Sequence, residues 1–234
     1  MTADCALRTA DSGVMFSSVV LDVDSTLCGI EGIDFLAARR SAEVGAQIAR
    51  VTERAMQGEL ALEEVYGERL GLIRPTVDDL HALRDAYAAA LAPGAAETID
   101  ALRSAGVRLA LVSGGIWQAI QPLARELGFD DGELNAVVLH FDREGRYASY
   151  DAGSPLATQT GKAEVVGALL DEGRLPRPLL AVGDGSTDVA MRDVADAFAA
   201  FTYFARRDTV VARADLEIAS FAQLARVVLG RLEV

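Results

Sequence analysis

The sequence predicts an α/β protein, a doubly wound parallel sheet with a small helical cap inserted after its first strand. Short, continuous apolar runs alternate with helical segments, which is the order of strands and crossover helices in a parallel sheet. Three of these runs end in aspartate, serine or glycine, residues that suit the loops at strand ends. A stretch of about 60 residues between the first two runs is helical in pattern and forms the insertion.

The predicted strands are short runs rich in valine, leucine and alanine, at residues 16–24, 107–115, 179–185 and 196–202. Runs of this length suit strands that are buried on both faces of a sheet. Helical patterns separate them at 94–106, 116–128 and 162–173. Residues 136–151 differ, because two strand-like pieces flank an Asp-Arg-Glu-Gly turn, and this pattern predicts a hairpin.

The insertion sets the expected domain boundaries. Its last helix should begin at Pro75-Thr76, and Pro93-Gly94 should end the helical region. We therefore expect a helical cap at 31–91, an α/β core at 14–30 and 92–234, and a flexible N-terminal tail at 1–13.

The composition argues against several classes of function. The chain has 234 residues, 51% of them hydrophobic, and a formal net charge of −13. Binding to nucleic acid or to an anionic membrane needs the opposite charge, so we expect neither partner. No apolar run reaches the length of about 18 residues that spans a membrane, and the N-terminus lacks the apolar segment of a signal peptide. Because two cysteines make no disulfide framework, we expect a cytoplasmic protein.

Polar side chains follow three of the predicted strands. Asp22, Ser113 and Asp184 each lie at the carboxyl end of a run, and Lys162 begins a helix nearby. Because the carboxyl ends of parallel strands face one crevice, we expect these side chains to share a ligand site. The cap begins close to Asp22 in the sequence, which places it to cover that site.

The charges of these residues indicate a phosphate site with a metal ion. Asp22, Asp24 and Asp184 repel one another and invite a hard divalent cation such as Mg²⁺, which prefers oxygen ligands and often binds substrate phosphate as well. Lys162 is the only lysine among the 22 basic residues. Lysine is a compact point charge, whereas arginine is a planar fork, so a cramped site beside a phosphate can require lysine.

Four motifs resemble those of the haloacid dehalogenase-like superfamily and occur in the same order: Asp-Val-Asp-Ser-Thr (22–26), Ser-Gly-Gly (113–115), Lys162 and Gly-Asp-Gly-Ser-Thr-Asp (183–188). Within that superfamily, the segments 22–37, 51–58 and 68–73 resemble the phosphoserine phosphatases, helical cap included. The resemblance covers about residues 18 to 222 and implies a Rossmann-like core.

The resemblance also implies roles in catalysis and metal binding. Asp22 would attack phosphorus and form an aspartyl-phosphate, and Asp24 would act as general acid and then as general base. Asp22, the backbone carbonyl of Asp24, and Asp184 would hold Mg²⁺, with Asp188 supporting them from nearby.

Substrate binding is implied for two further groups of residues. Ser113, the Gly114 amide and Lys162 would bind phosphate oxygens, the amides by lying at a helix start. Glu31 would bind the ammonium group of phosphoserine and Arg69 its carboxylate, with Thr187 close to the substrate.

Alternatives remain open for the substrate and the class of activity. Leu62 and the bulky segment 201–208 depart from the family pattern and could border the pocket. A phosphatase or phosphotransferase for phosphohomoserine, phosphothreonine or a sugar phosphate is therefore the alternative to a phosphoserine phosphatase. A non-catalytic phosphate-binding module would be expected to lack the nucleophile or the lysine, and both are present. A dehalogenase fits less well, because Asp24 as acid and base is a phosphatase feature. The sequence leaves the oligomeric state open, a homodimer included.

Overall fold

The computed structural model describes residues 15–56 and 62–230, and within them it leaves out the side chains of residues 49, 52–56 and 62–64. The tail expected at 1–13 and the side chain of Leu62 lie outside the described residues. The core is a six-stranded sheet in the order β3-β2-β1-β6-β7-β8, in which every neighbouring pair is parallel. The strands are β1 (Ser18–Leu21), β2 (Arg108–Ile116), β3 (Leu134–Val137), β6 (Leu179–Gly183), β7 (Ala197–Phe201) and β8 (Leu216–Ile218).

The apolar runs form strands because both faces of the sheet are covered. Along β1, Val19 and Leu21 belong to one hydrophobic cluster, whereas Val20 belongs to a second cluster on the opposite face. Successive side chains of a strand point to opposite faces, so a run without polar residues feeds two cores at once. The doubly wound parallel sheet predicted from the sequence is confirmed.

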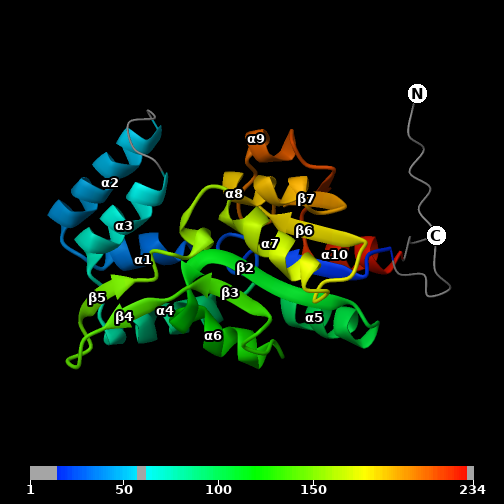
Figure 1. Ribbon diagram of the computed structural model, residues 1–234, viewed down its shortest axis with the longest axis horizontal. Coiled ribbons are helices and arrows are strands. Elements are labelled where there is room, and N and C mark those ends of the chain that lie inside the picture. The colour runs from blue at the N-terminus through cyan, green and yellow to red at the C-terminus, as the bar shows by residue number, and fades with distance from the viewer. Residues whose placement is uncertain (1–14, 57–61, 231–234) are drawn as a thin grey trace.

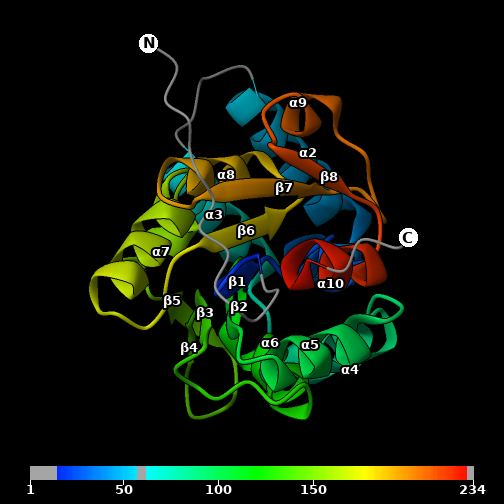
Figure 2. The ribbon, with the colours of Figure 1, turned by 90° about the vertical axis from the view of Figure 1, so that its right-hand side faces the viewer.

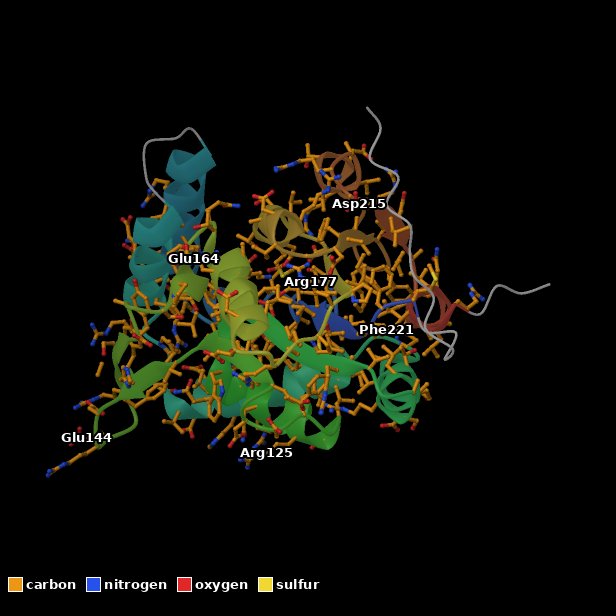
Figure 3. The ribbon with its side chains drawn as sticks, turned by 45° about the vertical axis from the view of Figure 1, so that its right-hand side comes forward. Arg125, Glu144, Glu164, Arg177, Asp215 and Phe221 are labelled. Carbon is orange, nitrogen blue, oxygen red and sulfur yellow. The ribbon has the colours of Figure 1, made fainter. Side chains whose placement is uncertain are left out.

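Helices cover both faces of this sheet (Figures 1 and 2). One face packs against α5 (Ala95–Ser104), α6 (Trp117–Glu126) and α10 (Phe221–Leu229). The other packs against α7 (Gly161–Asp171), α8 (Ser186–Val189), α9 (Asp208–Val211) and the 3₁₀ turn η2 (Ala190–Asp193). Figure 3 shows the same division between inside and outside: Arg125 lies at the outer margin of the molecule, whereas Phe221 belongs to the hydrophobic core.

The insertion between β1 and β2 is helical, as predicted. It contains α1 (Gly32–Ala38), α2 (Ala42–Met56), α3 (Leu62–Ile73) and α4 (Val77–Ala89). Figure 1 shows α2 and α3 side by side at one end of the molecule, whereas α4 packs mainly against the core helix α6. The cap boundaries at 31 and 91 stay a prediction.

Two features of the insertion follow from local chemistry. The helices α1 and α2 are separated at Arg39–Ser41, where the Arg40 guanidinium donates to the Ile73 carbonyl at 2.7 Å and pairs with Asp79. Thr76 caps α4: its hydroxyl accepts from the Asp79 amide, and the Asp79 carboxylate accepts from the Thr76 amide in return.

The hairpin predicted around residues 136–151 is present as β4 (Leu139–Phe141) and β5 (Tyr147–Tyr150), an antiparallel pair outside the main sheet. The Tyr150 ring packs at a tilt against Tyr66 of α3, with centroids 5.4 Å apart, so the hairpin touches the helical insertion. A further 3₁₀ turn, η1 (Pro155–Ala157), follows the hairpin. None of the helices in the described residues has both the length and the apolar character needed to cross a bilayer.

Candidate active site

The sheet order brings three motifs together. The central strand β1 pairs with β2 on one side and β6 on the other, with Leu21 opposite Leu111 and Val182. The residues that follow these positions meet at one edge of the sheet, in a cleft of about 690 Å³. Every residue predicted for the site lines this cleft: Asp22, Asp24, Glu31, Arg69, Ser113, Gly114, Lys162, Asp184, Thr187 and Asp188.

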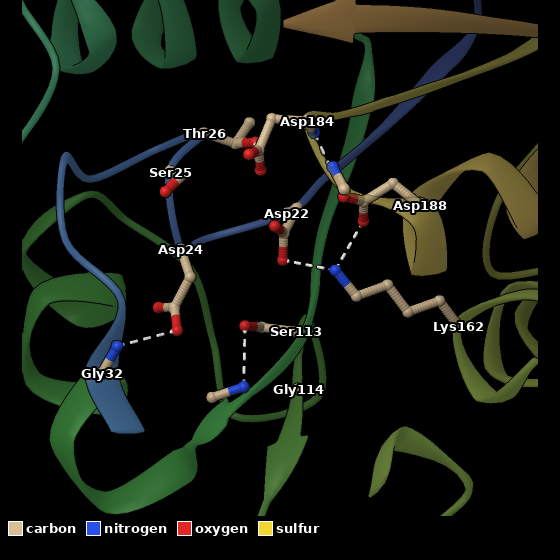
Figure 4. Close-up of polar contacts among 12 residues, drawn as sticks. Asp22, Asp24, Ser25, Thr26, Gly32, Ser113, Gly114, Lys162, Asp184 and Asp188 are labelled. Atoms are coloured by element: carbon tan, nitrogen blue, oxygen red, sulfur yellow. Dashed lines mark hydrogen bonds and ion pairs between the residues drawn. The ribbon is translucent and has the colours of Figure 1, made fainter. Parts of the chain in front are cut away.

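Asp22 and Lys162 lie at the centre of the cleft (Figure 4). The Lys162 ammonium is 2.6 Å from Oδ1 of Asp22 and 2.5 Å from Oδ1 of Asp188. Burial lowers the pKa of Lys162, but the charges of Asp188 and Asp22 outweigh this, so its pKa lies above the ordinary value. The lysine is therefore a permanent cation beside the predicted nucleophile.

A glycine allows the start of α7 to lie close to the 3₁₀ turn η1. A Cβ on Gly161 would lie 1.7 Å from the carbonyl oxygen of Pro155, which no side chain can tolerate. Only glycine lets the first turn of α7 approach η1 this closely. The neighbouring residue, Lys162, is thereby directed inward, and its side chain is only 6% exposed.

Asp188 ties the loop after β6 to this lysine. Its Oδ2 accepts the backbone amides of Asp184 at 3.1 Å and Gly185 at 2.8 Å, while its Oδ1 contacts Lys162. The Asp188 side chain rests on Gly183, where a Cβ would lie 2.2 Å from its Cγ. In the fourth motif, Gly183 therefore leaves room for the Asp188 side chain beneath the loop, and the Gly185 amide holds its carboxylate there.

Asp24 belongs to a turn, because β1 ends at Leu21 and the strand does not continue to residue 24. The next residue, Ser25, has a left-handed backbone with φ of 55°. The Asp24 carboxylate accepts the Gly32 amide at 3.0 Å and the Tyr87 hydroxyl at 2.6 Å. Burial raises the pKa of Asp24 to about 6, against the lowering effect of the Tyr87 hydrogen bond.

Ser113 and Gly114 differ from the prediction in one respect. The sequence places them at a helix start, but β2 continues through both to Ile116 and α6 begins at Trp117. The pairing of β2 with β3 is irregular between Val112 and Ile116, so these residues leave the regular ladder. The Ser113 hydroxyl accepts the Gly115 amide at 3.0 Å, which leaves its own hydrogen free to be donated.

The cap contributes both charged residues predicted for it. Glu31 accepts a hydrogen bond from the Ser25 hydroxyl at 2.6 Å. Arg69 forms an ion pair with Asp34 on the wall of the same cleft. Each of the two side chains therefore has a protein partner in this structure and faces the site that the core motifs build.

Comparison with known proteins agrees with this geometry. A model of the haloacid dehalogenase-like hydrolases matches residues 16–196. The phosphoserine phosphatase of Rattus norvegicus is 34% identical over 216 residues, which cover 92% of this chain and 93% of that protein. The chloroplastic phosphoserine phosphatase of Arabidopsis thaliana is 35% identical over 209 residues, covering 88% of this chain and 70% of that protein.

This chain belongs to the phosphoserine phosphatase family of haloacid dehalogenase-like hydrolases. A solved structure described as a phospho-aspartyl intermediate analogue of phosphoserine phosphatase superposes on it with a TM-score of 0.73 and 25% identity, covering 91% of this chain and 98% of that one. A substrate-bound phosphoserine phosphatase complex superposes with the same TM-score and the same coverage.

The carboxylates of this family member fit a divalent cation. Oxygens of Asp22, Asp184 and Asp188 lie within 4.8 Å of one another, and all three residues are buried. Among the described side chains, Oδ1 of Asp22 and Oδ2 of Asp184 are buried and accept no aligned hydrogen bond, although Lys162 and Arg207 contact them as ion pairs. Buried carboxylate oxygens with unused lone pairs suit a hard cation.

Three side chains in or beside the cleft were given no role in the sequence interpretation. Arg207 reaches Asp184 and lies 3.6 Å from Glu31, so the segment 201–208 borders the site as expected, although no residue of it had been singled out. Tyr66 donates from its hydroxyl to the Gly114 carbonyl at 2.9 Å, which joins α3 to the predicted phosphate motif. Tyr87 reaches Asp24 from α4, 63 residues away, and no local pattern marks it.

Proposed function

We propose that this protein is a Mg²⁺-dependent phosphomonoester hydrolase that converts O-phospho-L-serine to L-serine and phosphate through an aspartyl-phosphate intermediate. The observation that carries the proposal is the buried contact between Asp22 and Lys162, a carboxylate and a permanent cation, at the floor of the cleft. Glu31 and Arg69 line the wall of the same cleft, where they can bind the two charged ends of an amino acid.

The first chemical step is assigned to Asp22. Its carboxylate oxygen attacks phosphorus, the ester bond to the serine oxygen breaks, and an aspartyl-phosphate forms. Water then attacks this intermediate and releases phosphate, so one difficult hydrolysis becomes two easier steps. Lys162 offsets the repulsion between the carboxylate and the phosphate, which amounts to about 4 kcal/mol for two unit charges 4 Å apart near a protein surface.

Asp24 is assigned the proton transfers. It gives its proton to the departing serine oxygen and later takes one from the attacking water, help that is typically worth about 10²–10⁴-fold. A general acid works best when its pKa lies near the operating pH. Burial raises the pKa of Asp24 to about 6, which favours this role.

Mg²⁺ would be held by Asp22, the backbone carbonyl of Asp24, and Asp184, with Asp188 beside them. When bound, such a cation neutralises carboxylate and phosphate charge and polarises the phosphoryl group. The protein groups assigned to the phosphate oxygens are the Ser113 hydroxyl, the Gly114 amide and Lys162.

The cap residues define the rest of the substrate. Glu31 would bind the ammonium group and Arg69 the carboxylate of phosphoserine, with Thr187 close to the substrate. A guanidinium matches a carboxylate in a bidentate pair, which suits Arg69 to this role. Ser25 now contacts Glu31, and Asp34 now contacts Arg69. On binding, the ammonium and carboxylate groups of the substrate would take the places of these two partners.

A second candidate is a related phosphatase or phosphotransferase for phosphohomoserine, phosphothreonine or a sugar phosphate. Arg207 favours the sugar phosphate among these, because its guanidinium lies 3.6 Å from Glu31 and neutralises the charge that would attract the ammonium group of an amino acid. A substrate without an amine would then lose nothing at this end of the cleft.

The test is phosphate release from a panel of these esters, measured with Mg²⁺ and with a chelator. We expect a preference for L-phosphoserine that disappears in Arg69→Ala, and no activity in chelator. Arg39→Ala is the matched control, a cap arginine that does not line the cleft. Good Mg²⁺-dependent turnover of a sugar phosphate with phosphoserine poor would select the second candidate.

We further propose a cytoplasmic setting and a small-molecule substrate, with neither nucleic acid nor membrane as partner. The net charge of −13 supports the exclusion of polyanionic partners. The oligomeric state stays open, a homodimer included.

A further inference from the structure

Tyr87 is a buried residue outside the motifs, and its hydroxyl lies against one of them. It lies on α4 with 0% of its surface exposed, and its ring belongs to the main hydrophobic cluster. Its hydroxyl is 2.6 Å from Oδ1 of Asp24, the proposed general acid, while Oδ2 accepts the Gly32 amide at 3.0 Å. The carboxyl group is therefore held at both oxygens, which leaves it one orientation.

Two glycines make room for this hydroxyl. A Cβ on Gly32 would lie 2.3 Å from the Tyr87 oxygen, and a Cβ on Gly115 would lie 3.1 Å from it. Gly32 opens the first helix of the cap, and Gly115 belongs to the predicted phosphate motif. The Tyr87 hydroxyl therefore fits between Gly32 and Gly115, where neither residue has a side chain, and it contacts Asp24.

We propose that Tyr87 is the positioning residue of the general acid, holding the Asp24 carboxyl in the orientation that delivers its proton to the leaving oxygen. The inference rests on the proposed function, because it assigns that proton transfer to Asp24. As the bond between phosphorus and the leaving oxygen breaks, the Asp24 proton goes to that oxygen and Asp22 bonds to phosphorus.

The leaving group separates positioning from a general loss of structure. Serine leaves as a basic alkoxide and needs the proton, whereas p-nitrophenolate is a stable anion that departs without one. A residue that acts through the general acid therefore matters for phosphoserine and little for p-nitrophenyl phosphate. A residue that merely supports the fold would affect both esters alike.

The experiment measures leaving-group release in the first turnover, by rapid mixing, for both esters with Mg²⁺ present. In Tyr87→Phe we expect release from L-phosphoserine to slow by about 10- to 100-fold, the range for losing one hydrogen bond to a charged group. Release of p-nitrophenolate should slow by less than about threefold on the same reasoning. Tyr147→Phe, the same change at a buried tyrosine of the hairpin, should leave both rates within about twofold. Equal losses on the two esters, or no loss on phosphoserine, would overturn the proposal.

A second variant keeps the proposal testable if Tyr87→Phe does not fold. In Gly32→Ala the new methyl group would collide with the Tyr87 oxygen and displace it from Asp24, so the same selective loss on phosphoserine is expected. Combining the two changes should give no greater loss than Tyr87→Phe alone, because the hydrogen bond can be lost only once. Fully additive losses would contradict the shared cause.

An error in the proposed substrate can be told apart from an error in the role proposed for Tyr87. If the wild type hydrolyses another alkyl phosphate in place of phosphoserine, the proposed substrate is wrong, and the comparison with p-nitrophenyl phosphate is made with that ester. Absence of turnover on every ester would reject the proposed function and the role of Asp24 together.

Discussion

Lys162 and Asp22 form an ion pair inside the protein, with Nζ 2.6 Å from Oδ1 and each side chain 6% exposed. The same ammonium contacts Asp188 at 2.5 Å, so one cation serves two buried carboxylates. Removing one partner of a buried pair is costly because it leaves an uncompensated charge. The two buried carboxylates therefore require a cation at this position.

Lys162→Arg should be a poor replacement although it keeps the charge. The guanidinium is larger and planar, and the space between Asp22 and Asp188 is fully buried, so the new side chain displaces both carboxylates. We expect turnover to fall by about 100-fold or more, the scale for losing one transition-state donor. Steady-state kinetics with the preferred ester measures it. Arg177→Lys, at an exposed pair with Asp196, is the control, and normal activity in the Lys162→Arg variant would make the lone lysine an accident.

Asp22→Asn should abolish turnover and leave the fold intact. The amide has nearly the shape of the carboxylate but cannot attack phosphorus to form the aspartyl-phosphate. Acid quenching with radiolabelled substrate should trap a phosphorylated wild-type protein and no phosphorylated variant, while circular dichroism confirms the fold. Substantial Mg²⁺-dependent activity in the variant would show that another residue is the nucleophile.

The stability of the metal-free protein should decrease as the pH rises. Burial, followed by the charge of Asp188, raises the pKa of Asp22 above the ordinary value of about 4, against the lowering effect of Lys162. The folded state therefore holds this proton more tightly than the unfolded state, and stability is lost as the pH rises through the raised pKa. In chelator, Asp22→Asn should gain free energy of unfolding relative to the wild type between pH 5 and pH 8. Urea unfolding at the two pH values tests this, and a constant difference between the two proteins would contradict it.

The sequence predicted the floor of the site because its motifs lie at strand ends. Asp22, Ser113 and Asp184 follow three neighbouring strands, and parallel pairing alone brings such residues to one edge. The strands β3 and β8 were missed for a physical reason. They have four and three residues, and each has side chains that are only partly buried, so neither forms a continuous apolar run.

Contacts between distant elements could not be predicted from local pattern. Tyr87 and Arg207 reach the site from α4 and from the segment after β7, and a tyrosine or an arginine in such places usually packs or faces solvent. The same holds for the contacts of Arg40 at the break between α1 and α2, because its partners Ile73 and Asp79 lie in two later helices. These features depend on tertiary contacts, which the local sequence pattern does not indicate.

Mg²⁺ should stabilise the folded protein through the buried carboxylates. A ligand that binds only the folded state adds to the free energy of unfolding, by about 2.7 kcal/mol when its concentration is 100 times its dissociation constant, and so raises the unfolding temperature. We expect the thermal midpoint of the wild type to rise with MgCl₂ and to fall in chelator. Asp184→Asn should lose this response, whereas Asp196→Asn, at a half-exposed surface pair, should keep it. A full response in Asp184→Asn would remove Asp184 from the metal site.

Gly183→Ala should damage the site without touching a charged residue. The added Cβ would lie 2.2 Å from Cγ of Asp188, so Asp188 must leave its place beside Lys162 and beneath the loop. Overpacking of this kind costs about 1–3 kcal/mol of stability, and the displaced carboxylate should also reduce turnover.

Gly167→Ala is the matched control, because the atom nearest its added Cβ is a Val194 methyl carbon 4.0 Å away. Its position within α7 predicts unchanged activity and a gain of up to about 1 kcal/mol from helix propensity. Thermal denaturation measures the stability of both variants, and initial rates measure their activity. If Gly183→Ala were as stable and active as Gly167→Ala, the close packing of Asp188 on Gly183 would not be what holds Asp188 against Lys162.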